Sequence, residues 1–453
     1  MRETIAAIAT PVAPSAIGIV RLSGPEAVEI LERVFTPAAG APLKERRPGT
    51  LVYGLLRDGE GQLLDQCLAT FSRAPHSYTG EDTAELQCHG SAAVLRGALE
   101  VLFQAGARQA RAGEFTRRAF LNGKLDLVQA EAVIDLIDAQ TPQAARNAAG
   151  QLSGVMSRRI NDIYDHLLDL MAHFHAVLDY PDEDIDPFER REIQEYVDQS
   201  AKSLTQLYQS YRRGRRLREG VPTAIVGAPN AGKSALLNAL LGYERAIVTD
   251  IPGTTRDTVE EQAQLGGVLL RLIDTAGLRD TEDRVEQLGV ERSRQALEGA
   301  ELALVVIDGS KPLDDLDRSA LEAARSVERR LVLVNKSDRE AYEIPEELRD
   351  WECLGVSART GEGLEALEDR VGQWFAHRDE GRGELLTNAR QAEAVLRAAE
   401  CLQGAQNALE AGMPPDAVLS DVEGTLEALG EVNGRRVSED VTSRIFERFC
   451  VGK

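Results

Sequence analysis

Hydrophobic and polar positions follow three successive patterns along the 453 residues of the chain. Residues 1–123 mix short runs with β-like character, such as 16–24 and 83–90, with helical stretches at 25–35 and 91–104. Strands and helices interspersed in this way are typical of a small α+β domain. We therefore expect an N-terminal α+β domain over the first 123 residues.

The second pattern is purely helical and the third alternates. Over residues 124–219 the β signal disappears, and apolar residues recur at helical spacing in 125–140 and 160–180, which predicts long packed helices. The acidic stretch 180–187 contains two prolines and predicts a loop. Residues 220–377 alternate continuous apolar runs with helical segments, which favours a mainly parallel sheet covered on both faces.

Helices return after residue 377 and continue to residue 453. Because helices flank the α/β block on both sides, the economical interpretation is one helical domain, split into 124–219 and 378–453, with the domain 220–377 inserted into it. The predicted fold class is multidomain, with an α+β N-terminal domain, a split all-α helical domain and an inserted α/β domain.

Charge and cysteine content exclude several classes of protein. The chain has 52 Lys and Arg against 74 Asp and Glu, a formal net charge of −22, which argues against a protein that coats nucleic acid by bulk charge. The five cysteines include no Cys-x-x-Cys pair, so their spacing indicates neither a disulfide framework nor a zinc site. Since there is no apolar run of about 18 residues and no convincing signal peptide, we expect a cytoplasmic protein without membrane contact.

The strongest chemical signal is the segment GAPNAGKS at 227–234, which matches the phosphate-loop pattern G-x-x-x-x-G-K-[ST]. It follows an apolar run and precedes a helical one. Its glycines let backbone N–H groups close around phosphates at the positive end of the next helix. Lys233 is expected to contact the β- and γ-phosphates, and Ser234 to ligate Mg²⁺. The alternative, a plain glycine-rich turn, does not require this strand–loop–helix context.

Three further segments follow in the order typical of a GTPase: DTAG at 274–277, NKSD at 335–338 and SAR at 357–359. Asp274 can hold the outer shell of magnesium. Asp338 can accept hydrogen bonds from the N1–H and 2-amino groups of guanine, whereas adenine presents an acceptor at N1 and no 2-amino group, a costly mismatch. The inserted domain is therefore predicted to be a P-loop GTPase domain, not an ATPase.

The water-orienting glutamine of Ras-like GTPases is replaced by Leu278, directly after DTAG. Leucine cannot orient water, so hydrolysis is either feeble or assisted by another group. Asn230 and the segment 249–257 offer a polar side chain and free carbonyls. These groups can hold a monovalent cation against the phosphates and supply charge as an arginine finger does.

The chain resembles a known family. The segments APNAGKS, DIPGTTRD, DTAGLRD and FCVGK, together with GIVRLSG, SYTGEDTAEL, GEFTRRAFLNGKLDL and QAEAVIDLIDA, are similar to those of the MnmE or TrmE family of tRNA-modification GTPases. The resemblance spans nearly the whole chain. Pro252 and Val451 depart from the common pattern, and Pro252 removes one N–H from the loop that contains it.

The resemblance implies a folate-binding N-terminal domain that dimerises, a split helical domain and an inserted GTPase domain. It implies that an aminomethyl or carboxymethylaminomethyl group is installed at C5 of the wobble uridine, position 34, of certain tRNAs. The implied one-carbon donor is a tetrahydrofolate derivative, in the 5-formyl or 5,10-methylene form. A flavoprotein partner of the MnmG or GidA type, which uses FAD and NADH, completes a hetero-oligomer with the homodimer, and the GTPase domains pair across K⁺.

Carried over by position, the resemblance implies roles for individual residues. Glu286 corresponds to the catalytic glutamate that positions water, and Ser234 and Thr255 to the magnesium ligands. Potassium would be held by Asn230, Thr249, Ile251 and Thr254. Folate would be bound by Arg21, Glu85, Lys124 and Lys453, and Cys450 falls where the family has a cysteine with possible chemistry. The GTP-binding positions are Asn230, Ala231, Gly232, Lys233, Ser234, Ala235, Thr249, Asp250, Ile251, Pro252, Gly253, Thr254, Thr255, Asp274, Thr275, Ala276, Gly277, Asn335, Lys336, Asp338, Ser357, Ala358 and Arg359.

Simpler interpretations stay open for several of these residues. Glu286 lies in a charge-rich helical stretch, where a solvated glutamate is the alternative, and Cys450 can be a packed core cysteine. The cluster of Lys124 with Arg117 and Arg118 is either a solvated face or a contact for folate or phosphate. The basic run 211–218 is either a tRNA contact or solvated charge.

For the whole chain, two rivals remain: a GTP-dependent RNA-binding or assembly factor, and a scaffold that dimerises through its GTPase domain. The first rival predicts a recognisable RNA-binding module, and no basic aromatic motif of that kind is visible in the sequence.

Overall fold

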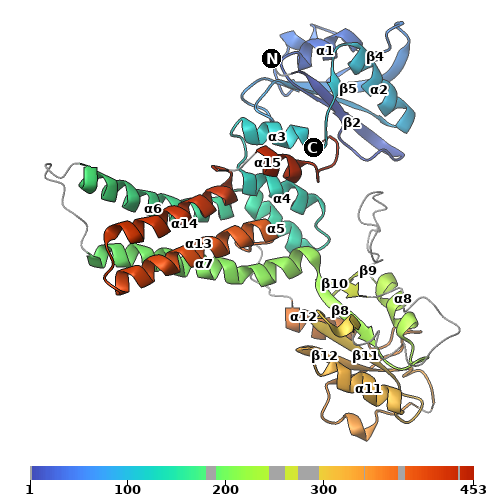
Figure 1. Cartoon of the computed structure of the whole chain (residues 1–453). Helices are drawn as coiled ribbons and strands as arrows, with labels where there is room; N and C mark the ends of the chain where they lie inside the picture. The colour runs from blue at the N-terminus through green and yellow to red at the C-terminus, as the bar shows by residue number, and fades with distance from the viewer. Residues whose placement is uncertain are drawn as a thin grey trace. The chain divides into compact units, whose positions relative to one another are not determined.

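The computed structural model describes residues 3–179, 190–243, 261–273, 295–340, 342–375, 383–436 and 439–452. The chain forms two compact units (Figure 1). The first contains Met1–Ile134, Ser157–Asp169 and Glu423–Lys453, and the second contains Asp135–Met156 and Leu170–Val422. Helices α6 (Val155–Asp179) and α14 (Pro415–Asn433) contribute residues to both units.

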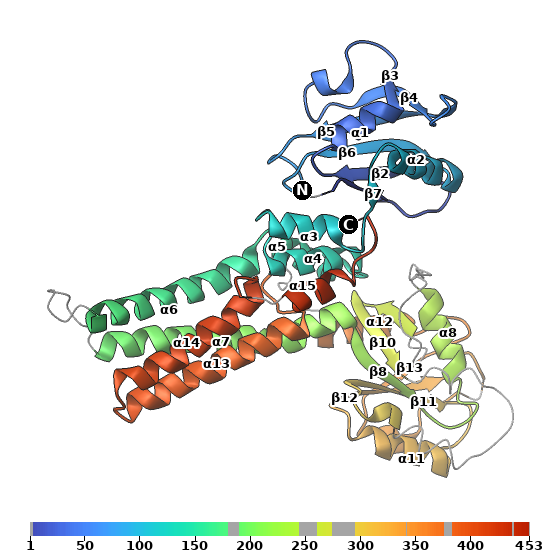
Figure 2. The same ribbon diagram turned by 45° about the horizontal axis from the view of Figure 1, so that its top comes forward.

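The first unit is built on a seven-stranded sheet of order β3-β4-β5-β6-β2-β1-β7. Neighbouring strands are antiparallel except for the parallel pair β1 and β7. Helices α1 (Ala27–Val34) and α2 (Ala92–Gln104) pack into the same core as the sheet, as Figure 2 shows. The strands are β1 (Ile5–Ile8), β2 (Ser15–Ser23), β3 (Phe35–Pro37), β4 (Val52–Arg57), β5 (Leu63–Ser72), β6 (Thr83–Gly90) and β7 (Arg108–Gln109).

Alternation along the central strands decides which side chains reach that core. Val20 and Leu22 of β2 and Leu86 of β6 are buried against the helices. Their neighbours Arg21 and Glu85 therefore point to the opposite face, because successive side chains of a strand alternate between the two faces. Arg21 lies directly opposite Glu85 in the pairing of β2 with β6.

The C-terminal segment packs against helix α3 (Glu114–Leu121) within the same unit. Helix α15 (Glu439–Phe446) places the ring of Phe446 at 6.2 Å from that of Phe120 and 5.4 Å from that of Phe449. Gly113 has φ of 63°, and a Cβ there would clash with the backbone oxygen of Phe446. Residues at the two ends of the sequence are therefore held side by side by close backbone approach.

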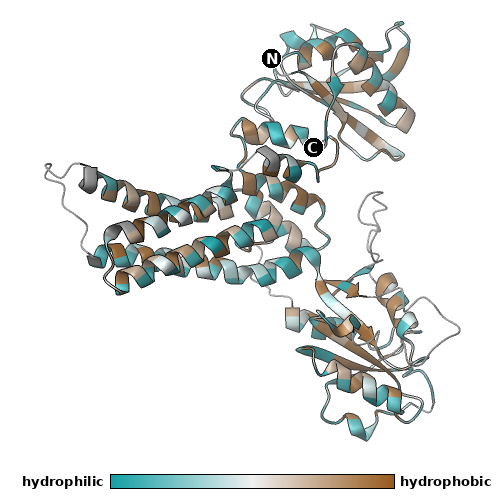
Figure 3. Cartoon of the chain, in the orientation of Figure 1, coloured by the Kyte–Doolittle hydropathy of each residue, from teal (hydrophilic) through white to brown (hydrophobic). Residues whose placement is uncertain are grey.

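The second unit contains a six-stranded sheet of order β13-β12-β11-β8-β10-β9, parallel except for β9 against β10. Helices α8 (Lys233–Tyr243) and α12 (Leu364–Phe375) pack into the core of one face, and α11 (Asp315–Ala324) into that of the other. In Figure 3 the strands of this sheet are largely brown, as expected when both faces are covered. The strands are β8 (Val221–Val226), β9 (Glu261–Leu265), β10 (Val268–Ile273), β11 (Leu302–Asp308), β12 (Arg329–Asn335) and β13 (Cys353–Gly355).

Long helices precede and follow this sheet in the sequence. Helices α7 (Arg190–Glu219) and α13 (Ala389–Glu410) pack along each other, and a Cβ on Gly214 of α7 would clash with the backbone of Leu386. The Gln151 side chain donates to the carbonyl of Leu385 at 2.6 Å. The chain thus returns to the same helices after the sheet, and the predicted fold class, with a split helical domain around an inserted α/β domain, is confirmed. Two shorter helices, α4 (Leu127–Ile137) and α5 (Pro142–Leu152), also precede the sheet in the sequence.

None of the helices in the described part of the chain combines the length and apolar character that crossing a membrane requires.

Candidate functional site

The predicted phosphate loop joins β8 to α8 and depends on unusual backbone conformations. Gly227 has φ of 149° and Gly232 has φ of 103°, and a Cβ on either would clash, with the backbone of Val306 or with the Asn335 amide. Asn230 also has positive φ, 62°. Successive residues of this kind turn backbone N–H groups toward one concave surface, which is how such loops bind anions.

Lys233 opens helix α8 and lies over this loop. Its ammonium group donates to the carbonyl oxygens of Gly227 and Ala228, both at 2.8 Å. Burial lowers the pKa of the Lys233 ammonium group from its ordinary value. The charge is therefore held in a site where two neutral carbonyls are weak partners, and an anion such as a phosphate would be a better one.

The predicted base-reading residues converge beside the loop. The buried Asn335 side chain donates to the carbonyl of Ala231 at 2.9 Å and accepts from the N–H of Ala358 at 3.0 Å. Asp338 accepts hydrogen bonds from the Ser357 hydroxyl and from the guanidinium of Arg359, each at 2.6 Å. The Ser357 hydrogen bond, with that of Arg359, holds the pKa of Asp338 below its usual range. The carboxylate is thus kept ionised as an acceptor.

Asp308 was not predicted as a site residue from the sequence, yet it contacts Lys336, one of the predicted GTP-binding residues. It ends strand β11, forms an ion pair with Lys336, and accepts from the Ser310 hydroxyl at 2.6 Å. Lys336 also donates to the carbonyl of Asn230 at 3.0 Å. The position of Asp308 was a usable signal, because the carboxyl ends of parallel strands are where open α/β sheets bind ligands.

Many predicted residues lie outside the described part of the chain. These are Thr249, Asp250, Ile251, Pro252, Gly253, Thr254, Thr255, Asp274, Thr275, Ala276, Gly277, Leu278, Glu286 and Lys453. The predicted loop 180–187 is also outside it.

The predicted folate residues of the first unit lie around one patch of the sheet. The Arg21 guanidinium pairs with Glu85 at 2.8 Å and lies 6.0 Å from the ring centres of Tyr78 and Phe115. The Tyr78 hydroxyl lies 2.9 Å from that of Thr116, and burial raises the pKa of Tyr78. The two aromatic residues were not predicted. Phe115 is fully buried and supports the arginine from below, whereas Tyr78 is 39% exposed and adds a flat apolar surface beside a charged pair, which suits a planar heterocycle.

The segment 75–80 connects this patch to Lys124. The Lys124 ammonium group donates to the carbonyl of Pro75 at 3.2 Å, and its side chain packs against Gly80. On the other side, a Cβ on Gly452 would clash with the backbone of Ile8. Cys450 is exposed, so the packed-core interpretation of this cysteine is wrong.

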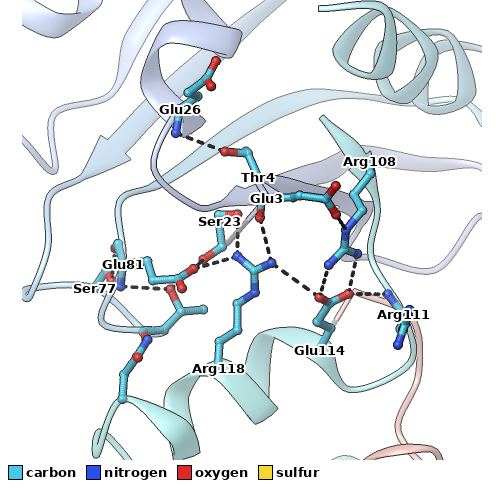
Figure 4. A network of polar contacts seen from close by, with 12 residues as sticks. Glu3, Thr4, Ser23, Glu26, Ser77, Glu81, Arg108, Arg111, Glu114 and Arg118 are labelled. Atoms are coloured by element: carbon cyan, nitrogen blue, oxygen red, sulfur yellow. Dashed lines mark hydrogen bonds and ion pairs between the residues drawn. The ribbon is translucent and has the colours of Figure 1, made fainter. Parts of the chain in front are cut away.

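Arg118 is neither part of a solvated face nor free to contact a ligand, and both interpretations of it were wrong. Its side chain is 6% exposed and donates to Glu81 at 2.7 Å and to the carbonyl oxygens of Ser23 and Glu3 at 3.1 and 2.8 Å (Figure 4). It also pairs with Glu114 at 3.4 Å. This network ties α3 to β2 and to the segment before β6.

Glu114 makes this network sensitive to acid. Burial alone would raise its pKa, but hydrogen bonds from Arg108 and from the N–H of Arg111 lower it from 4.5 to about 2. A lowered folded-state pKa stabilises the fold above the unfolded value and loses that effect as pH falls from about 4.5 toward 2. With allowance for solvent screening, we expect a loss on the order of 2 kcal/mol.

This acid sensitivity is measurable by hydrogen exchange of peptides covering α3 at pH 6 and pH 3.5. Both tryptophans, Trp351 and Trp374, lie in the second unit, so their fluorescence does not report on this network. Glu114→Gln should be less protected at pH 6 but change less with pH. A wild-type-like decline in the variant would assign the effect to other groups.

The basic run of helix α7 is largely paired within the second unit. Arg212 lies 3.6 Å from Glu328, Arg216 pairs with Glu301, and Arg218 pairs with Asp135 at 3.0 Å. Arg215 also pairs with Glu219 at 3.0 Å. These ion pairs fit the interpretation as solvated charge, but the side chains of Arg212 and Arg215 are 64% and 48% exposed, so the tRNA contact stays a prediction.

Two protein-family models together match nearly the whole chain. A model described as GTP-binding protein TrmE N-terminus matches residues 4–124, and one described as MnmE helical domain matches residues 127–450. A protein of Symbiobacterium thermophilum named tRNA modification GTPase MnmE is 46% identical over 455 residues, covering 100% of this chain and 99% of that protein. The chain belongs to the MnmE family. Family members of the same name from Clostridioides difficile and Roseiflexus are 41% and 43% identical, each over 100% of this chain and 99% of the relative.

As an MnmE-family GTPase, the chain is a GTP hydrolase. The MnmE match explains why a phosphate loop and a helical domain split around it occur in one chain.

Proposed function

We propose that this chain is a potassium-activated GTPase that modifies tRNA together with a flavoprotein partner. The modification is an aminomethyl or carboxymethylaminomethyl group at C5 of the wobble uridine, with a tetrahydrofolate one-carbon donor. The proposed domains are 1–123, 124–219 with 378–453, and 220–377. The protein acts as a cytoplasmic homodimer, and the partner is of the MnmG type, with FAD and NADH. Nearly full-length identity of 46% to a tRNA modification GTPase supports the proposal.

The observation that carries the GTPase part is the connection between base site and phosphate loop. Asn335 bonds to Ala231 of the loop and to Ala358 beside the base site, so one buried amide positions both halves of a nucleotide pocket. In the proposal Asp338 reads guanine, and Lys233 moves from the loop carbonyls to the phosphates. Ser234, with Thr255, would hold Mg²⁺, which supplies positive charge to the transferred phosphoryl group.

The proposed potassium site uses Asn230 together with Thr249, Ile251 and Thr254. A cation there supplies positive charge to the phosphates, as an arginine finger does, in a chain with Leu278 in place of the water-orienting glutamine. Asn230 is suited to this because its left-handed backbone turns it at the tip of the loop, and its carbonyl is already the acceptor of one cation, Lys336.

We expect GTP turnover to rise about 10²-fold or more when Na⁺ is replaced by K⁺ at constant ionic strength, the range seen for one well-placed electrostatic group. Steady-state phosphate release by the full chain measures it. Glu286→Ala in K⁺ is the matched control, with GTP affinity near normal and turnover lost. Equal rates in both salts would refute the potassium proposal, and an active variant would remove Glu286 from the mechanism.

The folate part of the proposal rests on the patch of Arg21, Glu85 and Tyr78. A pterin ring carries an N–H next to an amino group, and the Glu85 carboxylate offers the matching pair of acceptors. The exposed face of Tyr78 would cover the ring. Lys124 and Lys453 would pair with the carboxylates of the glutamyl tail, and Cys450 would lie at the edge of this site.

We expect the full-length chain to bind 5-formyltetrahydrofolate in titration calorimetry, and Glu85→Gln to weaken binding about 10²-fold, because an amide presents a donor where the ring also has donors. Glu45→Gln, an exposed glutamate of the same unit, is the control and should bind like wild type. Full-length chain without folate affinity would favour the assembly-factor alternative. Mass analysis of tRNA wobble uridines from cells lacking the protein separates that alternative from the modifying enzyme.

A further inference from the structure

Three side chains of metal-ligating type converge at one end of the N-terminal sheet, away from the folate patch. Asp65 and Cys67 belong to β5 and Cys88 to β6, and their ligand atoms all lie within 4.8 Å of one another. Leu68 is paired with Gln87, so continuing this antiparallel register by one position brings Cys67 opposite Cys88. The sequence spacing gave no zinc signal because the two cysteines are 21 positions apart in the chain.

The cluster is buried on the helix-covered face of the sheet. Cys67 is 4% exposed and Cys88 is 2% exposed, and both belong to the core that includes Leu95 of helix α2. The side chain of Asp65 is 8% exposed. A carboxylate among buried thiols is costly unless a cation or strong donors compensate it.

His89 holds the carboxylate in place from the solvent side. Its backbone N–H donates to one oxygen of Asp65 at 2.9 Å, and its Nδ1 lies 2.8 Å from the other. The imidazole is 72% exposed. Carboxylates that bind metals are themselves held by hydrogen bonds from outer-shell groups, which is the role of His89 here, and the exposed imidazole gives the cluster a route from solvent.

The dimensions suit a small thiophilic cation. Two sulfurs bound tetrahedrally to zinc at about 2.3 Å each are about 3.8 Å apart, within the spread of the ligand atoms here. The ligands come from adjacent paired strands, so the backbone is already fixed before binding. Two thiolates and one carboxylate are a donor set that favours Zn²⁺ over Mg²⁺ or Ca²⁺.

We propose that Asp65, Cys67 and Cys88 form a binding site for a zinc-type divalent cation that joins β5 to β6. Each thiol loses its proton to solvent as its sulfur bonds to the metal, so one cation is exchanged for two protons. His89 orients the Asp65 carboxylate, and the fourth position is taken by water.

The test is titration of the reduced, full-length chain with Co²⁺ in excess Mg²⁺, which occupies the oxygen-rich nucleotide site. We expect one equivalent to bind with intense sulfur-to-cobalt absorption and the visible bands of a tetrahedral site, and Zn²⁺ to displace it. Cys67→Ser and Cys88→Ser should lose the sulfur-to-cobalt band. Cys401→Ser, a half-buried cysteine of α13, is the matched control and should keep it.

Two further variants keep the test decisive if the serine variants fail to fold. Asp65→Asn keeps the shape of the ligand but lowers its charge, and His89→Ala removes the supporting imidazole. Both retain the thiols, and we expect about 10- to 100-fold weaker binding of Co²⁺ for each. Absence of thiolate absorption in the wild-type chain, or its persistence in Cys67→Ser, would overturn the proposal. Unchanged affinity in both Asp65→Asn and His89→Ala would also overturn it.

Discussion

Asp338→Asn should convert the chain from a guanine-binding to a xanthine-binding protein. We expect GTP affinity to fall by a factor on the order of 10⁴, the lower end of the discrimination that a site built around one hydrogen-bond pattern achieves. Guanine presents two donors to residue 338. The carboxylate accepts both, whereas an amide directs its own N–H₂ toward one of them.

The contacts around Asp338 let the substitution change base recognition without disturbing the rest of the pocket. Ser357, which is fully buried, and Arg359 hold the carboxylate from the side of the protein. An asparagine can keep the serine contact through its oxygen, so the pocket is preserved while the face toward the base changes. Xanthine carries a carbonyl where guanine has its 2-amino group, and this carbonyl can accept from the new amide.

Competition binding with fluorescent GTP, GDP and xanthosine triphosphate measures this switch. Arg359→Ala is the control, because its side chain is 78% exposed and it acts on Asp338 without being the reader of the base. We expect it to change GTP affinity by less than about 10-fold, the scale of a surface ion pair. Undiminished GTP binding by Asp338→Asn would mean that another group reads the base.

Hydrophobic periodicity and sequence motifs were sufficient to predict the elements on which they agree. Strand β6 occupies the predicted run 83–90, and the phosphate loop lies between the predicted strand and helix. The short strand β9 was not predicted, although Gly266 and Gly267, with φ of 61° and 73°, form the kind of two-residue turn that joins paired strands. The two glycines signalled a turn, but strand β9 itself has only five residues, too few for a clear hydrophobic pattern.

Contacts between segments that lie far apart in the chain could not be predicted from the sequence. Arg117 and Arg118 are adjacent and identical in type, yet only Arg118 is buried. The reason is helical phase: Phe115, Arg118 and Ala119 share the inward side of α3, and the partner Glu81 is 37 residues away. Likewise, the register of β5 with β6, not spacing along the chain, brings Cys67 to Cys88. Tertiary pairing decides such sites, and periodicity alone does not encode it.

Arg118→Met should destabilise the first unit by about 3–5 kcal/mol, the cost of removing one partner from a buried charge network. Methionine fills much of the same volume, so lost packing is a minor part. Glu81, which is 13% exposed, would lose its ion pair with Arg118, whereas Glu114 would keep its two hydrogen bonds from Arg108 and lose only the longer contact at 3.4 Å. The carbonyl oxygens of Ser23 and Glu3 would also lose a donor (Figure 4).

Hydrogen exchange of peptides covering β2 and α3 measures this loss without mixing in the second unit. Arg111→Met is the matched control: its side chain is exposed and its contact with Glu114 is made by the backbone N–H, so we expect a change within about 0.5 kcal/mol. Glu81→Gln in the Arg118→Met background should recover part of the loss, because it removes the stranded charge. Equal exchange in Arg118→Met and Arg111→Met would mean that the network adds nothing to stability. Recovery by Glu81→Gln, in contrast, would identify the loss of the arginine from the Glu81 carboxylate, and not the missing side-chain volume, as the cause.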